Sequence, residues 1–135
     1  MAEDRLKYLD FLQSTISRMA SNSFLVKGWS VALGTAVLGF SVKESSWALA
    51  LIAAIPVASF WTLDAYYLGL ERRFRQLWED AVGDKVDLFN MNPGVLDPEL
   101  WIEAAWRPAV WLVHLPIFVA SLLVSAALAV ISLMK

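Results

Sequence analysis

Hydrophobic and polar positions divide the chain into three long apolar blocks separated by polar segments. The blocks cover residues 23–42, 47–69 and 109–134. Each holds the ~20 mostly apolar residues that a helix needs to cross ~30 Å of hydrocarbon. A chain of 135 residues is too short to surround three such helices with a soluble shell. The pattern therefore predicts an all-α integral membrane protein in which residues 1–135 form a single membrane domain.

The polar segments carry helical patterns of their own. Residues 3–20 predict a cytoplasmic amphipathic helix, which either packs within the protein or lies among lipid headgroups. Its apolar face is Leu6, Leu9, Leu12, Ile16 and Met19. The residues at 21–23 are typical helix caps and predict a new start for the first span. A turn at 41–46 is too short to do more than reverse the chain, so the first two spans form a hairpin.

Residues 70–108 predict a cytoplasmic helix that extends the second span, followed by a connector. Apolar residues recur every three to four positions across 70–82, and Gly83 ends the run. This stripe is expected to pack against the N-terminal helix. A short strand is expected at 86–91, and Asp97 with Pro98 predicts the start of a short interfacial helix.

The positive charges orient the three spans. Nine of the 11 lysines and arginines fall before the first span, near its start, or between the second and third spans, against only Lys43 and Lys135 on the other side. Positive charge concentrates on the cytoplasmic side of membrane proteins. We therefore expect a multi-pass protein of the bacterial inner membrane, with its N-terminus in the cytoplasm and its C-terminus in the periplasm.

Few residues offer catalytic or metal chemistry. The chain has no cysteine, and the single His114 cannot form a metal site alone. No phosphate-binding glycine loop is present, and no acid lies near His114 in the sequence to orient it as a base. These observations predict a protein that is not an enzyme and needs no metal or cofactor.

Two charged residues lie within the expected spans. Counted from the hairpin turn, Lys27 and Asp64 reach a similar depth near the cytoplasmic interface, at ~1.5 Å per residue. Charges inside a span usually pair with one another. We expect a Lys27–Asp64 ion pair, within or between subunits; alternatively, Lys27 extends to the headgroups and Asp64 to cytoplasmic water.

Small and polar side chains form two further stripes. In the first span, a seam of small residues predicts a close helix–helix contact, either within one chain or between subunits. It consists of Gly28, Ala32, Thr35, Ala36 and Gly39. In the third span, a polar stripe either packs against other helices or lines a pore with a basic mouth. The candidate pore-lining residues are Arg107, His114, Ser121, Ser125 and Ser132.

Three arginines, Arg72, Arg73 and Arg75, follow the second span. Topology and anionic lipid alone account for positive charge at this place. The same cluster also suits the phosphates of a nucleotide or an oligonucleotide.

Two segments resemble a known family. FLQSTISRMASNSFLVKGW, from Phe11, and FWTLDAYYLGLERRFRQLWEDAV, at 60–82, flank the hairpin. Together they resemble the SLATT-type modules of small bacterial membrane effectors in nucleotide-signalling antiphage systems, and more closely still the membrane effectors of Hailong-type defence systems. The resemblance covers about residues 5–82.

The resemblance implies a homo-oligomeric ion channel in antiviral defence, which depolarises the infected cell. It also implies a nucleotide or single-stranded DNA oligomer as ligand and a nucleotidyltransferase-fold partner that makes it. Three spans cannot enclose a pore alone, so conduction requires several copies, a tetramer or larger. The alternative is a non-conducting anchor or scaffold that recruits a soluble partner through residues 72–82. A small multidrug-type transporter fits less well, because Asp64 lies near the interface and not at mid-span.

Overall fold

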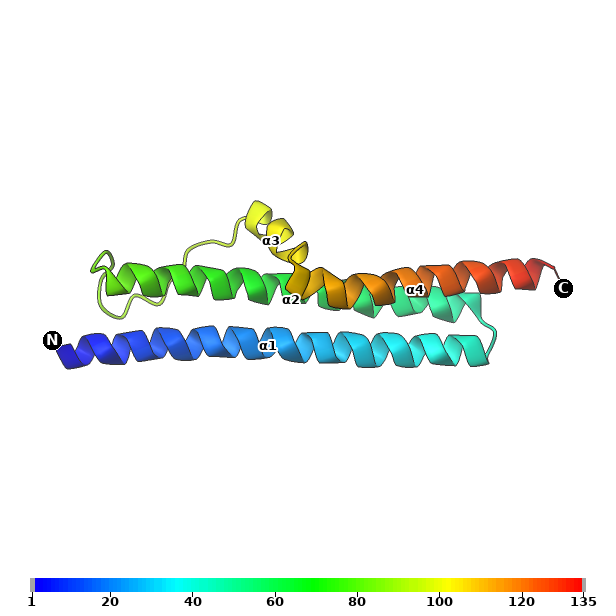
Figure 1. The fold of residues 1–135 in the computed structure, drawn as a ribbon, viewed down its shortest axis with the longest axis horizontal. Helices are drawn as coiled ribbons and strands as arrows, with labels where there is room; N and C mark the ends of the chain where they lie inside the picture. Colours follow the sequence, from blue (N-terminus) through cyan, green and yellow to red (C-terminus); the bar gives the residue numbers. More distant parts are fainter. Residues whose placement is uncertain (1, 135) are drawn as a thin grey trace.

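Four α-helices contain most of residues 2–134, the part of the chain that the computed structural model describes (Figure 1). They are α1 (Ala2–Lys43), α2 (Trp47–Val82), α3 (Pro98–Ala105) and α4 (Pro108–Leu133). Of these, α1, α2 and α4 are long and apolar enough to cross a membrane. The all-helical architecture with three candidate spans is therefore as the sequence predicts. Lys135, which entered the charge count, lies outside the described residues.

Helix α1 is one uninterrupted helix, which corrects the expected break at residues 21–23. Its 42 residues extend over ~63 Å, about twice the thickness of the hydrocarbon. The helical hydrogen bonds continue through this region, so no cap is needed. Ser23 is buried, and its hydroxyl donates to the side chain of Asp64 on α2. Ser23 thus satisfies a tertiary contact and does not begin a helix.

Helices α1 and α2 form the expected hairpin and lie side by side along their length, whereas α4 accompanies only the half nearer the turn (Figure 1). The side chain of Ser46 caps α2 by accepting from the Leu49 amide. Helix α2 then continues through Pro56 and ends before Gly83, as predicted. The molecule consequently has a three-helix half and a two-helix half.

The two-helix half has its own small core. Tyr8 and Leu12 of α1 pack against Leu77 and Ala81 of α2, which confirms the expected contact between the two segments. The apolar face predicted for the N-terminal segment is partly wrong, because Leu6 is 64% exposed while Tyr8 is 1% exposed. The reason is that the Tyr8 hydroxyl donates to the backbone carbonyl of Asn90, which makes burial of a tyrosine favourable.

The connector at 83–97 folds back over this core and contains no strand. Residues 86–91 form bends, turns and irregular backbone, so the expected strand is absent. Arg5 pairs with Asp84 and donates to the last carbonyls of α2, which fixes the end of the hairpin opposite the turn. Phe89 adopts a left-handed backbone (φ 63°) and places its ring against Tyr8, with centroids 5.8 Å apart.

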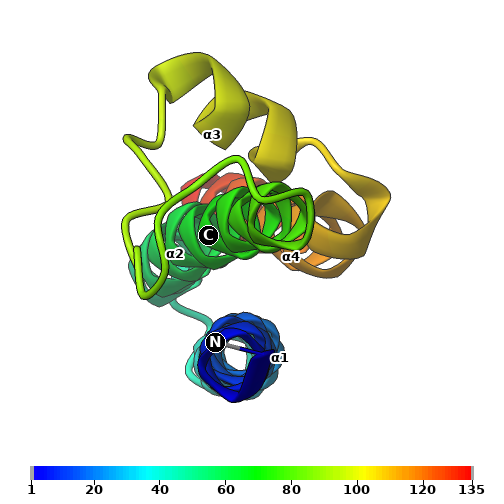
Figure 2. The ribbon, with the colours of Figure 1, turned by 90° about the vertical axis from the view of Figure 1, so that its left-hand side faces the viewer.

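Viewed along the helix axes, α2 and α4 form a layer, with α1 on one side and α3 on the other (Figure 2). Gly34 of α1 lies where α1 packs closely against both α2 and α4. A Cβ atom at Gly34 would lie 2.8 Å from methyl carbons of both Val57 and Ile117. This contact leaves no room for a larger side chain within the three-helix half.

The seam of small residues in the first span does not make this contact. Nothing lies within 4 Å of a Cβ atom built on Gly28 or Gly39. Ala32, Thr35 and Ala36 are exposed as well. The seam therefore faces away from the rest of the chain, so any close packing through it involves another molecule.

Candidate functional site

A buried carboxylate, Asp64 of α2, lies where the three long helices meet. Its side chain is 0% exposed. One oxygen, Oδ1, accepts hydrogen bonds from the Lys27 ammonium at 2.7 Å and from the Ser23 hydroxyl. The ion pair expected from hairpin depth is thus present, and it forms within one chain. Lys27 also donates to Ser23 at 2.7 Å, and its side chain is 20% exposed.

His114 of α4 completes this network from the opposite side. Its Nε2 lies 2.9 Å from Oδ2 of Asp64, and its Nδ1 lies 2.8 Å from the Ser30 hydroxyl of α1. A neutral imidazole with its proton on Nε2 satisfies both contacts, donating to Asp64 and accepting from Ser30. We call Ser23, Lys27, Ser30, Asp64 and His114 the Asp64 network. It joins all three candidate spans.

No acid lies near His114 in the sequence, but in the structure His114 pairs with Asp64, 50 positions away in the chain. Ser30, His114 and Asp64 have the connectivity of a nucleophile, a base and an orienting acid, although the ring nitrogens are used in the reverse order. Ser30 and His114 are both 0% exposed, so neither solvent nor a substrate reaches the hydroxyl. Because the hydroxyl is inaccessible, burial favours a role for these three residues in linking the helices over a role in catalysis.

Electrostatics explain why every charged or polar group of the Asp64 network has a partner. An unpaired charge within a membrane is expensive, and such charges are stable only when paired and hydrogen-bonded. The positive charge of Lys27 and the negative charge of Asp64 cancel, and each remaining polar group has a partner. Trp61 covers the network, its ring nearly parallel to that of His114 at 12°, with centroids 6.3 Å apart.

The central part of the polar stripe of α4 faces the chain's own helices, which favours the packing alternative over pore lining. Ser121 is 0% exposed and Ser125 is 7% exposed. Ser121 donates to the carbonyl of Ile117, and Ser125 donates across to the carbonyl of Trp47 on α2. With His114, they form a packing surface whose small side chains let α4 approach α2. Arg107 and Ser132 are exposed, but they lie at opposite ends of the helix.

The arginine cluster holds the connector and α3 in place. Arg72 pairs with Glu103 of α3 at 3.2 Å, and Arg73 pairs with Asp97 and donates to the Val95 carbonyl. Arg75 pairs with Glu71 one turn earlier on α2. All three candidate phosphate ligands thus have partners within the chain. Their side chains remain 27–58% exposed, so a phosphate can still reach them.

Glu103 is shared between two guanidinium groups. It accepts from Arg72 and, at 2.6 Å, from Arg107. Hydrogen bonds from these two arginines lower the pKa of the Glu103 carboxyl below its ordinary value of 4.5. This trio ties α2 to the α3–α4 junction.

These features define a helical protein with three candidate membrane spans and a charged network buried between them. Within residues 2–134, no group of three or more metal-ligating side chains is close enough to hold an ion. Comparison with protein-family models, with curated proteins and with solved structures finds no match to the chain.

Proposed function

We propose that the chain is the subunit of a homo-oligomeric, gated ion channel, a tetramer or larger, in the bacterial inner membrane. Its role is antiphage defence, and its gating is regulated by a nucleotide or single-stranded DNA oligomer that a nucleotidyltransferase partner makes. The defence role, the ligand and the partner rest on the sequence resemblance. Assembly and conduction are supported by two features of the structure.

The first feature is that the interior of one chain offers no path for ions. The Asp64 network fills the junction of the three spans, and Asp64 and His114 are fully buried. Nearer the turn, Gly34, Val57 and Ile117 are in direct contact. An ion pathway must therefore lie between copies of the chain.

The second feature, and the one that carries the proposal, is the outward face of α1. At 100° per residue, six small or polar side chains fall within about 60° of one another on this face. They are Ser17, Ser21, Gly28, Ala32, Thr35 and Gly39, all of them exposed. We call this face the α1 seam. Small residues allow close helix packing in lipid, where hydrophobicity does not drive association.

The α1 seam also replaces α4 as the candidate surface beside a pore. Thr35 donates to its own helix at Val31, and Ser17 and Ser21 continue the polar side chains toward the cytoplasm. The polar stripe of α4 is no longer the candidate pore surface, because Ser121 and Ser125 at its centre are buried. An assembly through α1 would place the hydroxyl-bearing face of each copy near the symmetry axis.

Conductance of the purified protein in planar bilayers tests the proposal. The wild type is expected to give discrete current steps. Gly28→Leu places a bulky side chain on the α1 seam and is expected to lower the conductance about tenfold, because close packing of the helices is lost. The matched control, Ala48→Leu, adds the same side chain at an exposed position of α2 and should leave the current unchanged. Silent bilayers containing oligomeric wild-type protein, both alone and with added nucleotides or single-stranded DNA oligomers, would contradict channel function.

A non-conducting scaffold is the second candidate, and an exposed apolar patch in the two-helix half favours it. Phe11 is 55% exposed and Phe89 is 49% exposed, and their ring centroids lie 6.5 Å apart. Patches of this kind on a water-facing domain often bind a protein. The scaffold predicts that a soluble partner co-purifies with the wild type and is lost with Phe11→Ser, while no current is recorded.

A further inference from the structure

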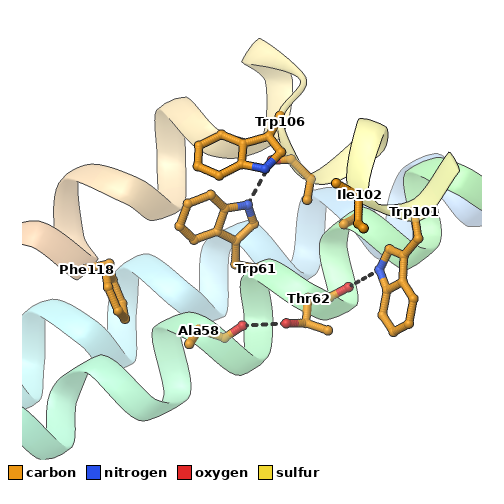
Figure 3. Close-up of a pocket in the computed structure, with 9 residues that line it drawn as sticks. Ala58, Trp61, Thr62, Trp101, Ile102, Trp106 and Phe118 are labelled. Carbon is orange, nitrogen blue, oxygen red and sulfur yellow. Dashed lines mark hydrogen bonds between the residues drawn. The ribbon is translucent and has the colours of Figure 1, made fainter. Parts of the chain in front are cut away.

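An apolar groove lies between α2, α3 and α4 (Figure 3). Helix α3 lies on the side of the α2–α4 layer away from α1 (Figure 2). Its volume is about 330 Å³. Aromatic rings from all three helices form the walls, and Trp61 contacts both Trp106 and Phe118 edge-on, with centroids 5.5 and 6.5 Å apart. Ala58 and Ile102 also line the groove. We call this the tryptophan groove.

Two indole N–H groups and one hydroxyl along the tryptophan groove are already paired. The Trp61 indole N–H donates to the carbonyl of Ala105 at 2.9 Å, and that of Trp101 donates to the carbonyl of Thr62 at 3.1 Å (Figure 3). The Thr62 hydroxyl in turn donates to its own helix at Ala58. A ligand would therefore be held by apolar contact, so the shape and chemistry of the groove fit a hydrocarbon chain.

The depth of the groove matches that of a lipid. Trp101 lies in α3 and Trp106 directly follows the last residue of α3, at the level where tryptophans favour the membrane–water interface. Phe118 lies ten positions into α4, ~15 Å deeper along the helix. The groove thus begins at the headgroup level and continues into the hydrocarbon region.

The charge at the interfacial end favours an anionic headgroup. Arg107 directly follows Trp106 and is exposed. Arg107 and Arg72 share the single carboxylate of Glu103, so this trio carries one uncompensated positive charge. Anionic phospholipids are attracted to basic side chains at the cytoplasmic surface.

We propose that the tryptophan groove binds one acyl chain of an anionic phospholipid, whose headgroup phosphate lies beside Arg107. Trp61 forms a wall of the groove and also covers the ring of His114. The lipid therefore contacts a residue that packs directly on the Asp64 network. This binding requires only that the chain is embedded in a membrane, and does not depend on ion conduction.

Photo-cross-linking in proteoliposomes tests this site with the full chain. The probe is a phosphatidylglycerol that carries a diazirine on one acyl chain, and mass spectrometry locates its adducts. In the wild type, adducts are expected to concentrate on the peptides that contain Trp61 and Ile102. Ala58→Trp fills the groove and should lower these adducts about tenfold. The control, Ala126→Trp, adds the same ring at an exposed position of α4 and should leave them unchanged.

Two further arms make the test decisive. Ile102→Trp fills the groove from α3 and serves if Ala58→Trp does not fold, as judged by its thermal transition. Arg107→Gln is expected to remove the preference for phosphatidylglycerol over phosphatidylcholine competitor. Adducts spread evenly over the exposed apolar faces of the wild type, adducts that persist when the groove is filled, or a second protein copy cross-linked there would each overturn the proposal.

Discussion

At the residue scale, Asp64 has the most demanding environment in the chain. Within a membrane its charge must be compensated, and each of its oxygens is occupied by partners from a different span. Oδ1 binds side chains of α1, and Oδ2 binds His114 of α4. The carboxylate therefore holds three helices in one rotational register.

Asp64→Asn should destabilise the folded protein strongly. The substitution keeps the size of the side chain but leaves the Lys27 ammonium without a counter-charge. Breaking a buried ion pair costs ~3–5 kcal/mol, and we expect about 3 kcal/mol because Lys27 retains some solvent contact. Thermal unfolding in mild detergent, followed by tryptophan fluorescence, measures the effect.

The double variant Lys27→Met with Asp64→Asn provides the control. It removes both charges, so most of the lost stability should return, and the two single changes should be strongly non-additive. Additive effects of the two substitutions would show that the ion pair does not couple α1 to α2.

Glu103 makes the attachment of α3 to α2 dependent on pH. Its pKa is lowered in the folded protein by Arg72 and Arg107, so its stabilising effect is present above pH 4.5 and is lost as the pH falls further. We expect α3 to loosen in this acidic range, detected as a shift in the emission of Trp101 and Trp106. Glu103→Gln should remove the shift, whereas Glu99→Gln on the same helix should keep it.

Part of the Asp64 network could be predicted from the sequence. The depth of Lys27 and Asp64 follows from counting residues out from a short turn, so their pairing was accessible. The roles of Ser23 and Ser30 were not, because serines are common on membrane helices and often bond to their own backbone. Pairing of His114 with Asp64 depends on how α4 is rotated against the hairpin, which local periodicity does not determine.

At the element scale, two glycines of α1 have opposite environments. Gly34→Leu should disrupt the fold, since even a Cβ atom there would lie 2.8 Å from Val57 and Ile117. Overpacking of this kind costs ~1–3 kcal/mol or more. Gly28→Leu should leave the thermal transition of the subunit intact and reduce only its assembly. Melting temperature and oligomer mass, measured in the same detergent, separate the two effects.

Equal losses of melting temperature in both variants would contradict the outward position of the α1 seam. The sequence predicted a seam of small residues here, but it did not single out Gly34 as the internal contact. Gly34 lies on the face of α1 that packs against α2, whereas Gly28 lies on a face that packs against no other helix of the chain. The face that packs against α2 is fixed by Tyr8, Leu12 and Ser23, whose side chains all reach α2 or its connector.

The same side chains explain why α1 continues without a break. Polar residues at 21–23 are typical of a helix start, yet tertiary contacts override such local preferences. The strand expected at 86–91 does not form, for a similar reason. The carbonyl of Asn90 accepts a hydrogen bond from the Tyr8 hydroxyl, and the connector does not pair with another strand. Both errors concern segments whose structure depends on a partner far away in the sequence.

At the scale of the whole molecule, the termini lie at opposite ends of the long axis (Figure 1). Three spans and the distribution of positive charge together predict a cytoplasmic N-terminus and a periplasmic C-terminus. A C-terminal alkaline phosphatase fusion should be active and a C-terminal green fluorescent protein fusion dark. The reverse result would place the two-helix half outside the cytoplasm.

The central claim is that copies of the chain meet through the α1 seam, and cross-linking in native membranes tests it most directly. The chain has no cysteine, so Ala32→Cys introduces a single reactive group on the seam and Ala126→Cys introduces one on exposed α4. A short bis-maleimide applied to isolated membranes should produce covalent dimers of Ala32→Cys and few or none of Ala126→Cys. Monomeric Ala32→Cys, or equal dimer yields from both variants, would contradict assembly through the α1 seam.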